Sequence, residues 1–236
     1  MSEWKTKRFW TDATVEEAAD GYRILLDGRG VKTPGRAALA VPTRPMAEAI
    51  AAEWAAQDDE IDPLSMPATR AANSAIEKIT PQRDAVVETL AEYGASDLIC
   101  YRAERPQALV ARQAQAWDPL LDWAADALGA RLTTTAGVMF QPQPADALAA
   151  LRAPLDAATV FELAGLHDLI MLSGSLVIGL KAREVDDPGA LWAASRVDEI
   201  YQADEWGYDE EAVAFAAGKE AAFRAAHRFY QLAQPA

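Results

Sequence analysis

The chain has 236 residues, with 22 Lys and Arg against 36 Asp and Glu, which gives a formal net charge of -14. This length suffices for one or two domains that bury a core of their own. The negative charge argues against binding to nucleic acid or to an anionic membrane, because binding to phosphate groups relies on Lys and Arg.

The first forty residues are β-prone. The pieces YRILLD (residues 22–27), VKTP (31–34) and LAVP (39–42) are separated by Gly and Pro, which is typical of a small antiparallel sheet. We expect three or four short strands, one of them at Phe9–Trp10. Thr43 followed by Pro45 indicates the start of a helix.

Helical periodicity dominates the remainder of the chain. The expected helices cover residues 46–57, 68–79, 80 to about 94, 106–128, 146–155, 159–182, 190–206 and 209–232. The segment SDLICYR (96–102) fits either a short helix or a buried strand. RLTTTAGVMF (131–140) is β-prone and could form a hairpin arm or an added edge strand.

These patterns predict an α+β protein. A small β-rich antiparallel N-terminal domain (residues 1–64), to which residues 130–141 could add a strand, is followed by a larger, mainly α-helical C-terminal domain (residues 65–236). The apolar stretch LIMLSGSLVIGL (169–180) is too short to cross a bilayer, so we expect it to form a buried helix.

The ionisable residues suggest where the protein acts and what it does not bind. A single cysteine, Cys100, excludes an intramolecular disulfide framework, and two histidines leave few ligands for a soft-metal site. The N-terminal MSEWKTKRFW has neither the apolar stretch of a secretion signal nor the composition of a transit peptide. We expect a cytoplasmic or already processed chain, without metal or cofactor.

Motifs of enzymatic chemistry are missing from the sequence. There is no P-loop, no G-x-S-x-G and no HExxH, and GRGVKT (28–33) lacks the third glycine of a dinucleotide fingerprint. Cys100 is better explained as a small buried side chain than as a nucleophile. No catalytic residue is therefore assigned.

His167 and Asp168 are the strongest candidates for acid–base chemistry. Adjacent side chains on a helix point about 100° apart, so we expect the two not to bond each other. A histidine that is hydrogen-bonded at the edge of a buried helix is the favoured interpretation. A small hydrolase or lyase that uses His167 and Asp168 with a further carboxylate is the alternative function.

The segment SRVDEIYQADEWGYDEE (195–211) is strongly acidic and also aromatic. Gly207 does not stand where a calcium loop of the EF-hand type needs its glycine. Helical spacing predicts a buried stripe at Leu191, Ala194, Val197 and Tyr201, with the acids on another side. A solvated face, a protein-binding surface and an active site all remain open; aromatic residues among charges favour the protein-binding surface over the active site.

Several blocks in order resemble a known family. They are RFW (8–10), YRILLDGRGVKTP (22–34), AVPTRPMAEAIAAEWAAQ (40–57), SMPATRAANSAIE (65–77), SDLICYRAERP (96–106), QAWDPLLDW (115–123) and SRVDEIYQADEWG (195–207). Together they resemble the assembly chaperone that handles the α subunit of the catalytic head of the mitochondrial-type ATP synthase. The resemblance covers nearly the whole chain.

The resemblance implies a non-enzymatic function. The protein would bind the unassembled α subunit of F-type ATP synthase and cover its subunit interface until the head assembles, without nucleotide hydrolysis. It also implies a β-rich domain joined to a helical one. Eukaryotic members carry an import sequence that is not found here, so we expect a bacterial member in the cytoplasm or a mature form in the mitochondrial matrix.

The resemblance also points to a site. The acidic position of the family's C-terminal helix falls on Asp198 or Glu199, and Ile200 stands where some relatives are acidic. With the acidic and aromatic cluster, this predicts a protein-binding site made of Asp198, Glu199, Gln202, Glu205 and Trp206. We expect the protein to act as a monomer.

Overall fold

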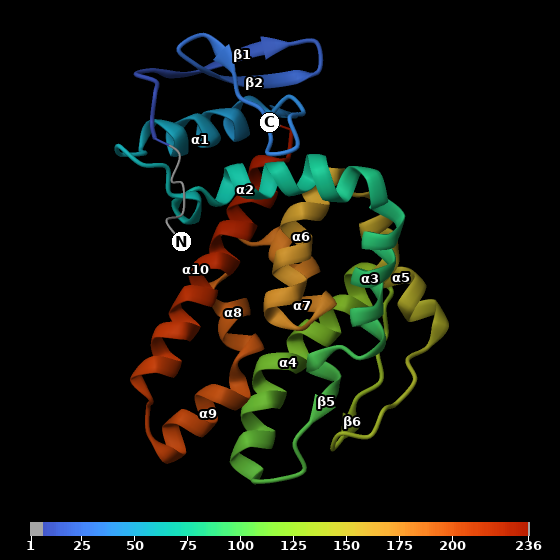
Figure 1. Ribbon diagram of the computed structural model, residues 1–236. Helices are drawn as coiled ribbons and strands as arrows, with labels where there is room; N and C mark the ends of the chain where they lie inside the picture. The colour runs from blue at the N-terminus through green and yellow to red at the C-terminus, as the bar shows by residue number, and fades with distance from the viewer. Residues whose placement is uncertain (1–6, 236) are drawn as a thin grey trace. The chain divides into compact units, whose positions relative to one another are not determined.

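The computed structural model describes residues 7–235 (Figure 1). The chain divides into two compact units. The first runs to Arg83 and includes Thr159–Gly165 and the chain from Arg228; the second comprises Asp84–Ala158 and Leu166–His227. Residues 65–83 thus belong to the first compact unit. These units are defined by compactness alone, so the predicted domain boundary after residue 64 stays a prediction. The first six residues of the N-terminal segment discussed above lie outside the described residues.

A hairpin forms the centre of the first unit's sheet. Strands β1 (Ala13–Ala18) and β2 (Gly21–Leu26) are antiparallel, and β2 also pairs with β3 (Arg29–Gly30) and β4 (Ala40–Val41), again antiparallel. Gly21 has φ 120°, and a Cβ atom there would lie 2.4 Å from the carbonyl oxygen of Val41, so the turn requires glycine. The predicted antiparallel sheet is confirmed.

The strand predicted at Phe9–Trp10 is wrong. Neither residue joins the sheet; instead Trp10 is buried, and its ring packs edge-on against Trp54 with 5.1 Å between the centroids. Its apolar character is used for packing against a helix rather than for strand pairing, and two or three apolar residues cannot distinguish these uses.

Two helices complete the described first unit before residue 83. Helix α1 (Arg44–Ala55) begins as predicted, because the Thr43 hydroxyl accepts a hydrogen bond from the Met46 amide at 3.2 Å. Helix α2 (Pro67–Ser74) continues as a π-helical turn over Ala75–Ile79 and a 3₁₀ turn over Thr80–Gln82. The Glu53 carboxylate accepts from the amides of residues 68 and 69 at 2.7 and 2.8 Å and so caps α2.

The second unit is mainly helical, as predicted. Its elements are α3 (Arg83–Ala95), β5 (Tyr101–Arg102), α4 (Gln107–Leu128), β6 (Thr135–Ala136), α5 (Ala145–Ala157), α7 (Leu176–Lys181), α8 (Gly189–Ser195), α9 (Val197–Trp206), most of α6 (Val160–Ser173) and most of α10 (Glu210–Leu232). With the sheet of the first unit, these elements confirm the α+β class.

Two uncertain segments pair with each other. Residues 96–102 form a 3₁₀ turn, Leu98–Cys100, followed by β5, and β5 pairs in parallel with β6. The idea that residues 130–141 add a strand to the N-terminal sheet is therefore wrong. These two short strands form backbone hydrogen bonds with each other, and both belong to the second unit.

Two predicted helices are interrupted. The pattern over 159–182 is broken at Gly174, which has φ 69°, and the Ser175 hydroxyl then accepts from the Ile178 amide at 3.0 Å to start α7. The pattern over 190–206 is broken at Arg196, whose φ of -118° and ψ of 17° separate α8 from α9. Among residues 7–235, no helix combines the length and apolar character that crossing a bilayer needs.

Candidate protein-binding site on helix α9

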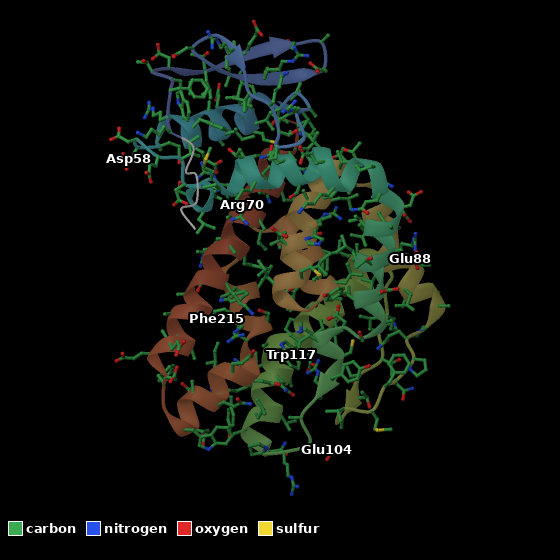
Figure 2. All side chains as sticks on the ribbon, in the orientation of Figure 1. Asp58, Arg70, Glu88, Glu104, Trp117 and Phe215 are labelled. Carbon is green, nitrogen blue, oxygen red and sulfur yellow. The ribbon has the colours of Figure 1, made fainter. Side chains whose placement is uncertain are left out.

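Helix α9 is held against α4 by its buried side. Val197 and Tyr201 are buried, as are Leu191 and Ala194 on α8, so the predicted apolar stripe is confirmed. The Trp117 indole of α4, labelled in Figure 2, donates a hydrogen bond of 2.7 Å to the Ala194 carbonyl at the end of α8. This bond fixes the start of α9 relative to α4.

Two neighbouring α4 side chains hold carboxylates of α9. The amide of the buried Gln113 donates to Asp198 Oδ1 at 2.7 Å, and the guanidinium of Arg112 lies 2.6 Å from Asp204 Oδ2. The same guanidinium lies over the Tyr201 ring, 5.1 Å from its centroid. Helix α9 is thus fixed at its first turn and its last turn.

Asp204 also fixes the turn that leads to α10. The Tyr208 hydroxyl donates to Asp204 Oδ1 at 2.6 Å. This bond and the Arg112 guanidinium lower the pKa of Asp204, and the carboxylate in turn raises the pKa of Tyr208. Asp204 is therefore an ionised anchor between α4, α9 and the turn.

The side of α9 away from the core is exposed. Glu199, Gln202 and Glu205 are exposed, and 80% of the Trp206 surface is accessible. Glu199 Oε1 lies 2.8 Å from Arg196 Nη1 at the start of the helix. Four of the five predicted site residues therefore share one exposed stretch of α9, in which an indole stands among carboxylates.

Asp198 differs from the other predicted site residues. It is half-buried, and its carboxylate accepts the hydrogen bond from Gln113. This bond holds α9 in place, and a role of Asp198 in binding a partner stays a prediction. Arg112, Gln113 and Tyr208 were missed as contributors, and the α4 residues carry no local signal, because they lie 85 to 92 positions from their partners.

His167 and Asp168 do bond each other, so the expectation that they would not is wrong. His167 Nδ1 and Asp168 Oδ1 are 2.8 Å apart. The Cα–Cβ bonds of adjacent residues diverge, but both side chains are short and can rotate toward each other on the surface. Both are well exposed, at 44% and 57%.

Metal ligands, a reactive thiol and a pocket could each support an enzymatic function. No three His, Cys, Asp or Glu side chains within residues 7–235 are grouped so that they could hold a metal ion. Burial raises the pKa of the Cys100 thiol to about 12, so the thiolate that a nucleophile needs is not formed near neutral pH. A pocket of about 190 Å³ is lined instead by α4 and the chain after it: Asp118, Leu121, Asp122, Ala125, Arg131 and Leu132.

A family model described as "ATP12 chaperone protein" matches residues 7–125. The chain belongs to the ATP12 chaperone family. The resemblance found in the sequence, to the family of ATP synthase assembly chaperones, is thereby confirmed. The matched region includes most of α4, with Arg112 and Gln113, and it ends before α9.

Solved structures extend the match to nearly the whole chain. Atp12 from Paracoccus denitrificans is 48% identical, with a TM-score of 0.94, and the match covers 98% of this chain and 100% of that one. An aspartate-to-lysine variant of the same Atp12p gives 48% identity, a TM-score of 0.94, and 99% and 100% coverage. A protein of Agrobacterium tumefaciens described as a candidate chaperone is 40% identical, with a TM-score of 0.92, and coverage of 97% and 86%.

Proposed function

We propose that this member of the ATP12 family is an assembly chaperone that binds the unassembled α subunit of F-type ATP synthase. It covers the surface that the α subunit later offers to the β subunit, and it does so by binding alone, without hydrolysing a nucleotide. Family membership supports the chaperone role, and the site on α9 supports the way in which the client is bound.

The observation that carries the proposal is the exposed Trp206 among carboxylates on a helix that is held at both ends. A large apolar side chain in water is unfavourable for the isolated protein, whereas at an interface tryptophan is among the residues that contribute most to binding. Glu199 and Glu205 beside it would attract a basic partner and speed its approach. Because α4 fixes α9, little side-chain and backbone freedom is lost on binding.

The test is co-expression with the α subunit of the same organism, with recovery of soluble α in complex with this chain as the readout. Glu199→Lys should reduce recovery, because it reverses a charge at the centre of the site. Glu92→Lys is the matched control, since Glu92 is an exposed glutamate on α3. Glu92→Lys should shift the free energy of unfolding by less than about 0.5 kcal/mol, whereas Glu199→Lys also loses the ion pair with Arg196 and should cost up to about 1 kcal/mol.

The outcomes separate the function from the site. Loss of the complex with Glu199→Lys but not with Glu92→Lys supports both. Equal recovery with both variants keeps the client and moves its binding site away from α9. If wild type neither raises soluble α nor binds it, the α subunit is not the client.

The alternative, a small hydrolase or lyase, has one observation in its favour, the 2.8 Å contact between His167 and Asp168. His167→Ala decides this point. It should leave recovery of the α subunit unchanged, whereas loss of a hydrolytic activity with recovery intact would favour the enzyme.

We also propose that the protein acts as a monomer in the bacterial cytoplasm, or in the mitochondrial matrix if the chain is a processed form. The single cysteine, which is buried as a free thiol, suits a reducing compartment. The high negative charge disfavours self-association. Sedimentation of the purified chain and fractionation of its host test the two statements.

A further inference from the structure

The first half of α10 is a helix without a covered side. None of residues 207–218 is buried, and the first buried residue of α10 is Phe223. This stretch nevertheless carries large apolar side chains: Tyr208, Val213 and Phe215 are 66%, 49% and 65% exposed. Figure 2 labels Phe215 on this part of α10.

Phe215 continues the face that α10 buries further along. It precedes Ala226 by eleven residues, about three helical turns, so the two lie on the same side of the helix, whereas Val213 points to nearly the opposite side. Ala226 is buried. The apolar side of the helix thus extends beyond the point at which the described part of the chain covers it, which is the arrangement of an unpartnered helix face.

We propose that Phe215 of α10, together with Tyr208, forms a second half of the client-binding surface and receives an amphipathic helical segment of the α subunit whose apolar side is bordered by Lys or Arg. This inference rests on the proposed function. It adds a surface on a second helix, next to Trp206 in the chain, and it specifies the chemistry of the segment that binds there.

Charge identifies the occupant. Residues 197–218 hold seven carboxylates and no Lys or Arg, and Arg112 and Arg196, which lie outside this range, pair with only two of the seven, Asp204 and Glu199. A second copy of this chain in a symmetric contact would bring these carboxylates against one another, which is unfavourable. A segment with basic residues beside its apolar face would instead be attracted, so the surface fits a basic client.

Lys219 limits where the client's own basic groups can lie. Lys219 Nζ stands 4.7 Å from the centroid of the Phe215 ring and covers it there. The client's apolar side chains therefore approach the rest of the ring, and its basic groups lie toward Glu205, Glu210 and Glu211, which are exposed.

The experiment measures binding of the α subunit to wild type, Phe215→Ser, Glu199→Lys and Leu64→Ser. Leu64 is the matched control, since it is an apolar residue of the first unit with 78% of its surface exposed. Phe215→Ser should weaken the apparent affinity by about tenfold or more. Leu64→Ser should leave it unchanged, and wild-type binding should weaken as salt is added.

Other outcomes overturn the inference. If Glu199→Lys weakens binding but Phe215→Ser does not, the proposed function stands and α10 is not part of its surface. If wild type binds no α subunit, both proposals fail. If the purified chain alone sediments as a dimer that Phe215→Ser dissociates, the face is a contact between two copies. Circular dichroism and urea unfolding of each variant confirm that the fold is intact, and if Phe215→Ser unfolds, Phe215→Ala replaces it with the same expectation.

Discussion

Replacing Asp97 by asparagine should remove part of the pH dependence of this protein's stability. Asp97 is fully buried, and its carboxylate accepts hydrogen bonds from the amides of Ile99 at 3.3 Å and Val177 at 3.0 Å. It thereby connects the turn before β5 to the first turn of α7. Burial raises the pKa of Asp97 from 3.8 to about 6, although these amides and the Ser175 hydroxyl favour the ionised form.

The magnitude follows from the two pKa values. A carboxyl group whose pKa is higher in the folded state binds more protons there than in the unfolded state, so stability falls as the pH rises from about 4 to about 6. The full difference corresponds to about 3 kcal/mol at neutral pH. About 2 kcal/mol of it should disappear when the pH is lowered from about 7 to about 4.5.

Urea unfolding of wild type and Asp97→Asn over this pH range is the assay. Asparagine keeps one acceptor and cannot ionise, so it changes stability by an amount that does not depend on pH. The exposed carboxylates titrate alike in both proteins and cancel in the difference. The stability of wild type relative to the variant should rise by about 2 kcal/mol on acidification. Parallel curves would show that the amide donors keep Asp97 ionised throughout, and the reasoning from burial would be wrong.

Three further substitutions test the fold. Gly218→Ala should stabilise the protein by about 0.5–1 kcal/mol in thermal unfolding, because the added Cβ meets no atom within 4 Å. A loss of stability would contradict the exposed position of Gly218 in α10. Gly21→Ala should destabilise it by several kcal/mol, since the Cβ would lie 2.4 Å from the Val41 carbonyl oxygen in a backbone with φ 120°; an unchanged urea midpoint would refute the tight turn. Trp117→Phe leaves the Ala194 carbonyl without its buried donor and should cost about 1–3 kcal/mol; a smaller cost would mean that water replaces the indole.

The sequence predicts those helix ends that are determined by interactions within one helical turn. Thr43 and Pro45 marked the start of α1, because a side-chain acceptor and a fixed φ act within one turn. The helix break at Gly174 was missed although a glycine stood there, because apolar residues continue on both sides and hide the change of direction. Arg196 carries no such mark, and its non-helical backbone depends on how α8 and α9 pack.

The site was predictable only in part for the same reason. The exposed residues of α9 followed from helical periodicity, and Glu199, Gln202, Glu205 and Trp206 are exposed as expected. The donors that hold the helix come from α4, and no pattern in either segment reveals a partner more than eighty residues away. Helical spacing does not predict the His167–Asp168 contact, because it gives the direction of each Cα–Cβ bond and not the rotation of the side chain.

The rate at which Cys100 is alkylated can report local unfolding of this protein. It is the single thiol of the chain, it is fully buried, and it follows Asp97 in the same short turn. A thiol with a pKa of about 12 hardly reacts while folded, so labelling by an alkylating reagent measures how often the turn between Asp97 and β5 comes apart. Comparing the labelling rate with and without a bound client would therefore show, without any engineered probe, whether the client stabilises the second unit of its chaperone.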